Sequence, residues 1–231
     1  IKNHGVETRI NKHPSTTGHS LTMITPDSER TFSVHLGAAL ELYKEDVLEE
    51  DIAKSRILHL EGYQLEGKTK ETVLEAIEIA KNNNTLVSID LADPGLIRRN
   101  KELVQDLLKK VDIVFLNEQE ASEFTGLEPE EALIQISQTV PTTIVKIGKE
   151  GSLINNQGII TLIPGFPAQT IDTTGAGDTY AAGFLYGYCQ GWEMEKAGKL
   201  GSLMAAKVVE QKGVRINQLD VEEIKQLITG Q

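Results

Sequence analysis

Apolar and polar positions alternate along the chain in a pattern that predicts short strands separated by helices. The apolar runs that fit buried strands are residues 56–63, 85–90, 111–117 and 142–148. The stretches with helical spacing between them are residues 68–84, 101–110 and 130–140. In the first of these stretches, Val73, Ile77 and Ala80 fall on one helical face. Buried parallel strands separated by helices are typical of a doubly wound α/β sheet.

Two further segments predict hairpins, and the end of the chain predicts helices. Residues 19–36 hold two β-rich runs separated by turn-forming residues 26–29, and residues 151–163 hold two runs around the polar turn 155–158. From Gly177 onward the pattern predicts three helices. The second is expected to end at Lys212 and Gly213, with glycine as its C-terminal cap.

Composition narrows the functional classes. Of the 231 residues, 39% are hydrophobic and 25% are charged, which favours one large domain with a substantial core. The formal net charge of −11 argues against nucleic acid and anionic membranes as partners. No run approaches the roughly 20 apolar residues of a membrane span, and nothing resembles a signal peptide, so we expect a cytoplasmic protein.

Cysteine and histidine give no metal-binding pattern. Cys189 is the only cysteine, so an intrachain disulfide and a multi-cysteine cluster are excluded. The apolar helical pattern around Cys189 predicts a buried thiol. The five histidines lack the paired spacing of a zinc site, and we expect them to serve in hydrogen bonds or at the surface.

The stretch DTTGAGDTYAAGF, residues 172–184, combines a glycine-rich turn with the start of a helix. Tyr180, Phe184 and Tyr188 recur every four residues, which predicts a helix that begins near Asp178. The glycines therefore lie at the N-terminus of this helix, where the helix dipole is positive.

This turn has the residues of an anion site with a base at its edge. Gly175 and Gly177 can adopt backbone angles closed to other residues, so that consecutive amides converge on one point. Asp178 would face that point and could take a proton from an attacking hydroxyl. The structural alternative is a glycine turn capped by Thr174 or Asp178.

The stretch as a whole resembles the C-terminal signature of the ribokinase-like carbohydrate kinases, also called the phosphofructokinase-B family. The resemblance implies a ribokinase-like α/β fold, with a mainly parallel central sheet flanked by helices on both faces and part of a small β lid. It implies that Asp178 is the general base. It also implies that the amides of Gly175, Ala176 and Gly177 stabilise charge on the transferred phosphoryl group.

Two metal roles follow from the same resemblance. In the stretch FLNEQEASEFTG, Asn117 and Glu120 end a buried strand and open a helix, an arrangement that by itself predicts helix capping. The family's Asn-x-x-Glu element acts on magnesium and the phosphates, through ordered water. The resemblance also implies that Asp172 and Thr174 help to hold a monovalent cation, with further ligands near residues 211–214.

The stretch VKIGKEGSLI resembles segments that line the nucleotide pocket in this family. It follows a strand and carries Lys146, Gly148 and Gly151, which we expect at the cofactor; an ordinary strand turn is the alternative. Arg30 stands in a Glu-Arg-Thr context similar to that of the adenosine-kinase-like branch, where an arginine approaches the reacting phosphates. A surface arginine on the hairpin is the alternative for Arg30.

Taken with the residues, the resemblance predicts a kinase that transfers the γ-phosphate of ATP to a hydroxymethyl group of a small sugar or nucleoside, with Mg²⁺ and K⁺ as cations. We expect residues 1–36 to belong to the lid and its return into the core, and residues 37–231 to form the kinase core. The glycine-pair signature of the family's N-terminal part is not found, so we expect that part to be missing. The full protein is expected to be a monomer or a homodimer.

Two other classes remain open from the sequence. The chain could be a nucleotide-binding fragment or a non-catalytic regulatory relative without a complete substrate site. It could also be a Rossmann dehydrogenase, although its glycine motif comes late in the chain, whereas a dinucleotide fingerprint follows a strand in an early βαβ unit.

Overall fold

A computed structural model gives the structure of the chain as two compact units. Unit 1 comprises Ile1–Ser55 and Gln64–Thr85, and unit 2 comprises Arg56–Tyr63 and Leu86–Gln231. The residues that the structure describes are 5–10, 12–24, 30–216, 222, 224 and 226. Within these, the side chains of Thr22, Ile24, Arg30, Thr31 and Phe32 lie outside the description.

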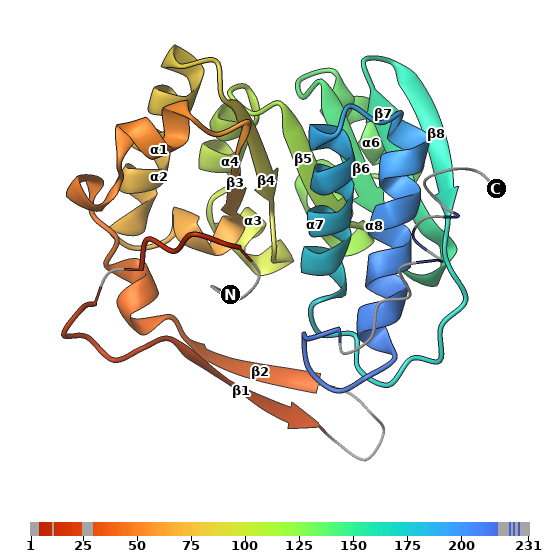
Figure 1. Cartoon of the computed structure of the whole chain (residues 1–231), viewed down its shortest axis with the longest axis horizontal. Helices are drawn as coiled ribbons and strands as arrows, with labels where there is room; N and C mark the ends of the chain where they lie inside the picture. The colour runs from red at the N-terminus through yellow and green to blue at the C-terminus, as the bar shows by residue number, and fades with distance from the viewer. Residues whose placement is uncertain are drawn as a thin grey trace. The chain divides into compact units, whose positions relative to one another are not determined.

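Unit 1 contains a hairpin, two short 3-10 turns and two helices (Figure 1). Their bounds are β1 (His19–Ile24), β2 (Arg30–His35), η2 (Gly37–Leu40), η3 (Lys44–Asp46), α1 (Glu49–Ala53) and α2 (Thr69–Asn82). Strands β1 and β2 pair antiparallel, with His19 opposite His35. The predicted hairpin is therefore confirmed, while its predicted turn lies outside the described residues.

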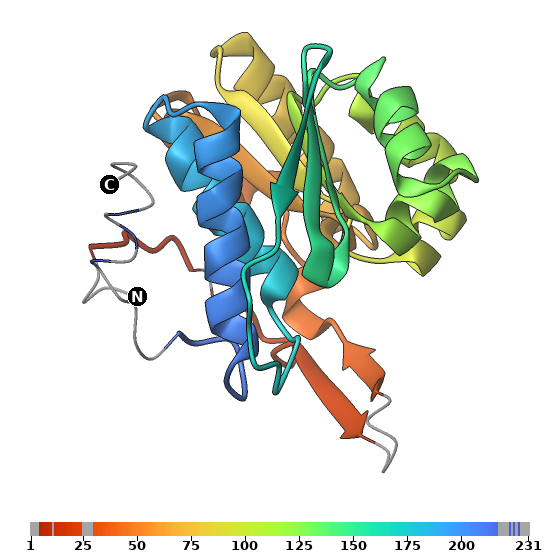
Figure 2. The same cartoon turned by 90° about the vertical axis from the view of Figure 1, so that its right-hand side faces the viewer.

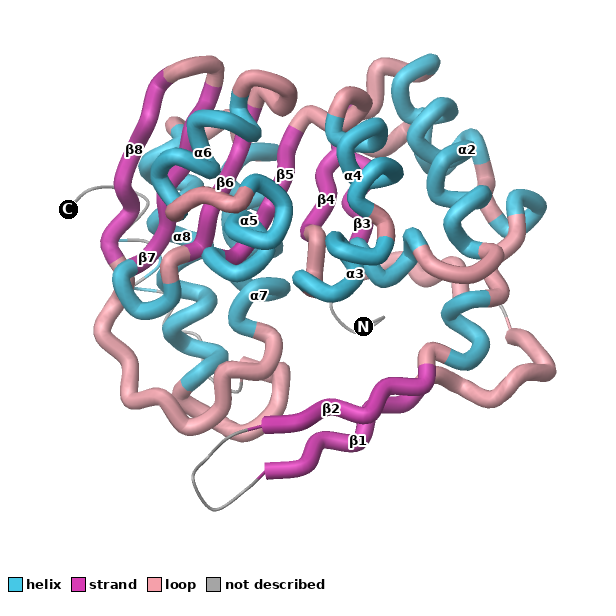
Figure 3. Tube along the Cα trace, turned by 180° about the vertical axis from the view of Figure 1, so that it is seen from behind, coloured by secondary structure: helices cyan, strands magenta, loops and turns pink. Residues whose placement is uncertain are grey.

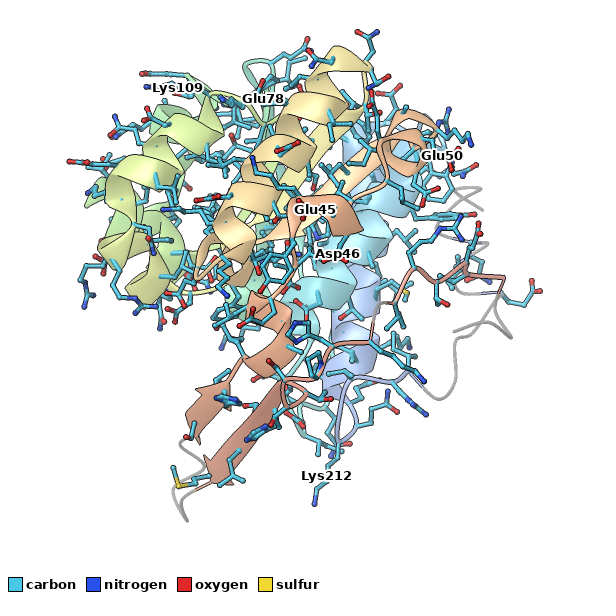
Figure 4. All side chains as sticks on the ribbon, turned by 90° about the vertical axis from the view of Figure 1, so that its left-hand side faces the viewer. Glu45, Asp46, Glu50, Glu78, Lys109 and Lys212 are labelled. Atoms are coloured by element: carbon cyan, nitrogen blue, oxygen red, sulfur yellow. The ribbon has the colours of Figure 1, made fainter. Side chains whose placement is uncertain are left out.

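Helix α2 forms as its apolar spacing predicts. Val73, Ile77 and Ala80 are all buried, and α1 packs against the same helix. The Oγ1 of Thr85 donates a hydrogen bond of 2.8 Å to the carbonyl of Ile52, which ties the end of α2 to α1. Several acidic side chains of unit 1 are exposed, among them those of Glu45 on η3, Glu50 on α1 and Glu78 on α2, which are labelled in Figure 4.

Unit 2 is built on one six-stranded sheet with the strand order β3-β4-β5-β6-β7-β8. The strands are β3 (Ile57–Glu61), β4 (Leu86–Asp90), β5 (Ile113–Asn117), β6 (Thr142–Lys146), β7 (Gly151–Asn156) and β8 (Ile159–Pro164). Strands β3 to β6 run parallel, whereas β7 and β8 form the predicted antiparallel hairpin. Gln157 and Gly158 both have positive φ, 50° and 91°, as a two-residue hairpin turn of type I′ requires.

Helices cover both faces of this sheet. They are α3 (Pro94–Arg99), α4 (Lys101–Leu108), α5 (Glu118–Thr125), α6 (Pro129–Ser137), α7 (Ala176–Cys189) and α8 (Met194–Val209), and the 3-10 turns are η4 (Gly62–Leu65) and η5 (Gly148–Glu150). Helices α7 and α8 lie on one face in Figures 1 and 2, and α3 to α6 lie on the other face in Figure 3. The doubly wound α/β arrangement predicted from the sequence is confirmed.

The core between the sheet and α7 is aromatic and aliphatic. Phe115 and Phe184 are fully buried, and their rings meet edge to face with centroids 5.5 Å apart. Tyr180 packs into the same cluster, as its helical spacing predicts. Cys189, at the C-terminal end of α7, is half-buried and not fully buried as its apolar pattern predicted, because it occupies the last turn of the helix.

The C-terminal segment differs from its pattern at one boundary. Helix α8 ends at Val209 with Glu210 as its C-cap, so Gly213, whose φ is 82°, does not cap it. The third predicted helix falls mostly outside the described residues. Within the described residues, the structure contains no helix that is long and apolar enough to cross a membrane.

Candidate active site

Four neighbouring parallel strands of unit 2 end in polar residues. Glu61, Asp90, Asn117 and Lys146 are the last residues of β3, β4, β5 and β6. Since these strands are parallel, their carboxyl ends meet at one edge of the sheet, which is where ligands bind in open α/β sheets. The candidate active site is built on this edge and on the loop that leads into α7.

The N-terminus of α7 is opened by a glycine and carries no side-chain cap. Gly175 is the N-cap residue, with φ at 80° in the left-handed region. Capping by Thr174 or Asp178, the structural alternative for this motif, is therefore not what the helix uses. Gly177 lies within the helix and does not have a positive φ, so the expectation that both glycines adopt special backbone angles is wrong for Gly177. Its role must come from the space that a missing side chain leaves.

The loop before α7 is tied to the segment after α8 through Asp172. The Oδ1 of Asp172 accepts hydrogen bonds from the backbone N of Thr174 at 2.9 Å and from its Oγ1 at 2.7 Å. The Oδ2 of Asp172 accepts a third hydrogen bond, from the backbone N of Gly213 at 3.1 Å. The structure thus brings Asp172 and Thr174 beside Gly213, which lies in the segment where further cation ligands are expected.

Asn117 and Glu120 form a reciprocal capping box at the start of α5. The Oδ1 of Asn117 accepts from the backbone N of Glu120 at 2.9 Å, and the Glu120 carboxylate accepts from the backbone N of Asn117 at 2.8 Å and from its Nδ2 at 2.6 Å. Glu120 is only 2% exposed. Burial, followed by the charge of Asp90, raises the pKa of Glu120 to about 7.

Lys146 and Asp90 form an ion pair across the end of β5. The Nζ of Lys146 lies 2.6 Å from the Oδ2 of Asp90, and the two side chains are 14% and 10% exposed. Strand β5 separates β4 from β6, so each side chain reaches over the end of the intervening strand. The other carboxylate oxygen of Asp90, Oδ1, accepts a hydrogen bond of 3.1 Å from the backbone N of Ala92, which shapes the turn after β4.

A cavity of about 620 Å³ opens beside these groups. The sequence-predicted residues that line it are Asn117, Lys146, Gly148, Gly151, Ala176 and Gly177. This volume suits a small organic ligand or cofactor. Residues from three separate stretches of the chain therefore line one cavity.

Asp178 lies in the first turn of α7 and is exposed, and it is not among the residues that line the cavity. Its charge acts on the end of β3: burial and then Asp178 raise the pKa of Glu61. Burial lowers the pKa of His59, and the charges of Asp90 and Asp178 oppose that effect. The Nδ1 of His59 lies 2.8 Å from the Oγ of Ser88. Asp178 thus acts on the β3 side of the helix N-terminus, whereas Ala176 and Gly177 line the cavity.

Comparison with known proteins identifies the family. The model of the family described as "pfkB family carbohydrate kinase" matches residues 1–221. This chain belongs to the pfkB family.

Relatives of known structure and sequence agree with this assignment. The crystal structure of a probable sugar kinase from Rhizobium etli is 34% identical, with a TM-score of 0.91, and the match covers 97% of this chain and 70% of that protein. Adenosine kinase from Sinorhizobium meliloti is 33% identical, with a TM-score of 0.84, and the match covers 93% of this chain and 66% of that protein. The predicted ribokinase-like fold is confirmed.

A nucleoside kinase from Methanocaldococcus jannaschii is 37% identical over 140 residues. That match covers 58% of this chain and 44% of the nucleoside kinase. This sequence match therefore spans less than half the length of the nucleoside kinase.

Several residues that line the cavity belong to no motif that predicts a site from the sequence. Those from the loop between β8 and α7 are Phe166, Ala168, Thr170 and Thr173, and those from α8 are Ser202, Ala205, Ala206 and Val209. The small residues of α8 repeat at helical spacing, which can equally indicate close helix packing. Which face of α8 meets the cavity depends on how it packs against α7.

The two glycines after β6 differ in what they do. Gly148 has a φ of 57°, and a Cβ there would have the Glu118 carboxylate as its nearest neighbour, at 4.0 Å. Gly151 has a φ of 110°, and a Cβ there would lie 1.9 Å from the carbonyl oxygen of Ile163. The glycine at 151 is therefore required by the pairing of β7 with β8, as the strand-turn alternative held, although its backbone also lines the cavity.

Two expectations stand apart from this site. The side chain of Arg30 lies outside the described part of the chain, so its approach to phosphates stays a prediction. Among the described residues, no group of three or more His, Cys, Asp or Glu side chains is arranged to hold a metal ion.

Proposed function

We propose that this chain carries the nucleotide site and the general base of a kinase that transfers the γ-phosphate of ATP to a hydroxymethyl group of a sugar or nucleoside. The observation that carries the proposal is the N-terminus of α7, where Ala176 and Gly177 line a cavity and the neighbouring Asp178 is exposed in the first turn of the helix. Membership of a carbohydrate kinase family supports the same reaction class.

In the proposed reaction, Asp178 takes the proton from the acceptor hydroxyl. The acceptor oxygen forms a bond to the γ-phosphorus, and the bond from that phosphorus to the β,γ-bridging oxygen breaks, releasing ADP. The backbone amides of Gly175, Ala176 and Gly177 donate to the charge on the transferred group. The positive end of this 14-residue helix, which has no side-chain cap, suits that task. The amide of Ala176 donates to the carbonyl oxygen of Thr173 at 3.2 Å and would exchange that partner for a phosphoryl oxygen.

The cavity side of the site would hold the nucleotide. Lys146, Gly148 and Gly151 line it, and the Lys146 ammonium provides a positive charge near the N-terminus of α7. The apolar side chains of Ala205, Ala206 and Val209 on α8 give a surface that a flat base could contact. These placements support ATP as the cofactor.

Magnesium fits the Asn117 and Glu120 pair through water. The carboxylate of Glu120 already accepts two hydrogen bonds from Asn117, and only Asn117 of the two lines the cavity. When bound, Mg²⁺ would neutralise phosphate charge. Asn117 would orient its hydration shell, and Glu120 would fix Asn117.

A monovalent cation such as K⁺ is proposed near Asp172 and Thr174. The carboxylate of Asp172 joins the loop before α7 to Gly213, so a cation bound there would order the backbone that leads to Gly175. Replacing KCl by choline chloride at constant ionic strength should lower turnover. Unchanged turnover would remove the cation from the proposal.

For the acceptor we favour adenosine-like nucleosides, with ribose, fructose and other sugars as the alternative. The nucleoside kinase and adenosine kinase relatives support the first class, and the probable sugar kinase supports the second. Cytoplasmic localisation remains an expectation from the sequence.

Substitution of Asp178 by Asn tests the proposal. ATP binding by calorimetry should change by less than about threefold, while turnover on the best acceptor of a nucleoside and sugar panel should fall by about 10²-fold to 10⁴-fold, the usual contribution of a general base. Asp106→Asn, on the exposed surface of α4, is the matched control and should retain both. Full turnover by the Asp178 variant would refute the assignment of the base. ATP binding by the wild type without turnover on any acceptor would instead support the nucleotide-binding alternative.

A further inference from the structure

We propose that Asp90 is a positioning residue that holds the Lys146 ammonium at the phosphate end of the cavity. Gly177 leaves the room that the ammonium occupies there, because it has no side chain. This inference rests on the proposed function, because it assigns a purpose to the ion pair within the same site. The phosphate groups of a nucleoside triphosphate are the ligand chemistry that this ammonium would meet.

The first observation is the geometry of the pair. Lys146 and Asp90 are separated by 56 residues in the sequence, and their side chains meet at 2.6 Å with little solvent exposure. A lysine side chain loses considerable rotamer entropy when it is ordered. In the free protein the contact with Asp90 already imposes that order, so a ligand would find the ammonium in place.

The second observation is the small distance between Gly177 and the ion pair of Lys146 and Asp90. A Cβ at position 177 would lie 3.0 Å from the Nζ of Lys146 and 4.0 Å from both its Cε and the Oδ2 of Asp90. Gly177 has no positive φ that would by itself demand glycine. We attribute the glycine at position 177 to the Lys146 ammonium, because the ammonium lies so close to the first turn of α7 that a side chain would crowd it.

The third observation is that the charge of Lys146 acts on the neighbouring strand ends. It lowers the pKa values of Glu61 and Glu120 against the dominant effect of burial, and it adds to the lowering of the His59 pKa. Lys146 thus lies among the groups at the ends of β3, β4 and β5. A displaced ammonium would change the electrostatics of the whole edge.

Asp90 opposes an anionic ligand by its own charge, and this makes the sign of the Asp90→Asn effect informative. If Asp90 acted only through its charge, neutralising it would tighten ATP binding. If Asp90 positions Lys146, the same change releases the ammonium and weakens ATP binding. We expect the dissociation constant and the KM for ATP to rise about tenfold, with the KM of the acceptor unchanged.

Glu123→Gln is the matched control, because it also removes a carboxylate from an ion pair, with Arg98, but lies on α5 away from the cavity. It should leave ATP affinity within about twofold of the wild type. Tighter or unchanged ATP binding by Asp90→Asn would overturn the positioning role.

A double-mutant cycle tests the link to Gly177. Gly177→Ala should weaken ATP binding about tenfold in the wild type, but by less than about twofold in a Lys146→Met background, where the ammonium is absent. Equal effects in the two backgrounds would show that position 177 acts independently of Lys146.

A measurement without nucleotide separates this inference from the proposed function. The rate at which an amine-acylating reagent labels Lys146, followed by mass spectrometry and normalised to the exposed Lys109, should rise at least threefold in both Asp90→Asn and Gly177→Ala. An unchanged labelling rate would overturn the inference whatever ATP does. Wild-type protein that fails to bind ATP would contradict the proposed function, while the labelling would still decide whether Asp90 holds Lys146.

Discussion

The hydroxyl groups of Ser152 and Tyr180 lie 2.6 Å apart and join β7 to α7 across the buried side of the cavity. Ser152 is 0% exposed and Tyr180 is 3% exposed. Burial raises the pKa of Tyr180 well above its usual value, so the phenol stays neutral. This bond helps to set how α7, which carries the proposed anion site, lies on the sheet.

Tyr180→Phe should lower the free energy of unfolding by about 1–3 kcal/mol, because it leaves the buried Ser152 hydroxyl without this partner. Tyr186→Phe on the exposed face of the same helix should change it by less than about 0.5 kcal/mol. Denaturant titration measures both. The double variant Tyr180→Phe with Ser152→Ala should be no less stable than Tyr180→Phe alone, and a strictly additive loss would argue against the bond.

Helices α7 and α8 pack so closely that adding one methyl group at Gly183 should lower the stability of the protein. A Cβ at Gly183 would lie 3.0 Å from the Cα of Gly201 and 3.0 Å from the carbonyl oxygen of Leu200. Gly183→Ala should therefore destabilise the protein by about 1–3 kcal/mol, although alanine is the better helix former. Ala182→Gly, at an exposed position of α7, measures the propensity effect alone and should cost about 1 kcal/mol. If Gly183→Ala stabilises the protein, the two helices are not held at this distance.

The raised pKa of Glu120 predicts that the stability of the protein depends on pH. The pKa of Glu120 is raised to about 7 in the folded protein, whereas an unfolded chain has a value near 4.3. Between these two values the folded state holds a proton that the unfolded state has lost, so the unfolding free energy falls as pH rises from about 4.3 to about 7. At about 1.4 kcal/mol per pKa unit, the total fall is on the order of 4 kcal/mol.

The measurement is urea unfolding in EDTA at several pH values, for the wild type and for Glu120→Gln. Since glutamine does not titrate, the difference in stability between the two proteins should shift in favour of the variant as pH rises through this window. A difference that is constant with pH would show that Glu120 titrates normally.

Gly175 and Gly158 form a matched pair for testing the left-handed N-cap. Both have positive φ, 80° and 91°, but a Cβ at Gly175 would lie 2.9 Å from the Cγ1 of Val214, whereas nothing lies within 4 Å at Gly158. Gly158→Ala should cost about 1–2 kcal/mol, from backbone strain alone. Gly175→Ala should cost more and should also weaken ATP binding at least tenfold, as thermal unfolding and calorimetry would show. If both variants lose the same stability and Gly175→Ala still binds ATP as tightly as the wild type, Gly175 has no role in the proposed anion site.

The sequence by itself determined the order and type of most of the elements, although the short helix α3 was not predicted. Alternating apolar runs and helical stripes are local patterns, and they gave the strands of unit 2, both hairpins and the helix that follows the glycine motif. Val73, Ile77 and Ala80 are buried as their spacing predicts, because one side of a helix must leave water wherever the helix packs. The motif of residues 172–184 likewise placed Gly175, Ala176 and Gly177 at a helix N-terminus without any knowledge of neighbours.

Only the tertiary structure decided which of these groups meet. The pairing of Lys146 with Asp90 depends on β4 and β6 lying on either side of β5, which no local pattern states. The same holds for the face of α8 that lines the cavity and for Gly177, whose importance comes from the ammonium below it and not from its own backbone angles. Local periodicity follows from the geometry of one element, whereas the contacts of a site arise from elements far apart in the chain, and their packing selects which side chains come within reach.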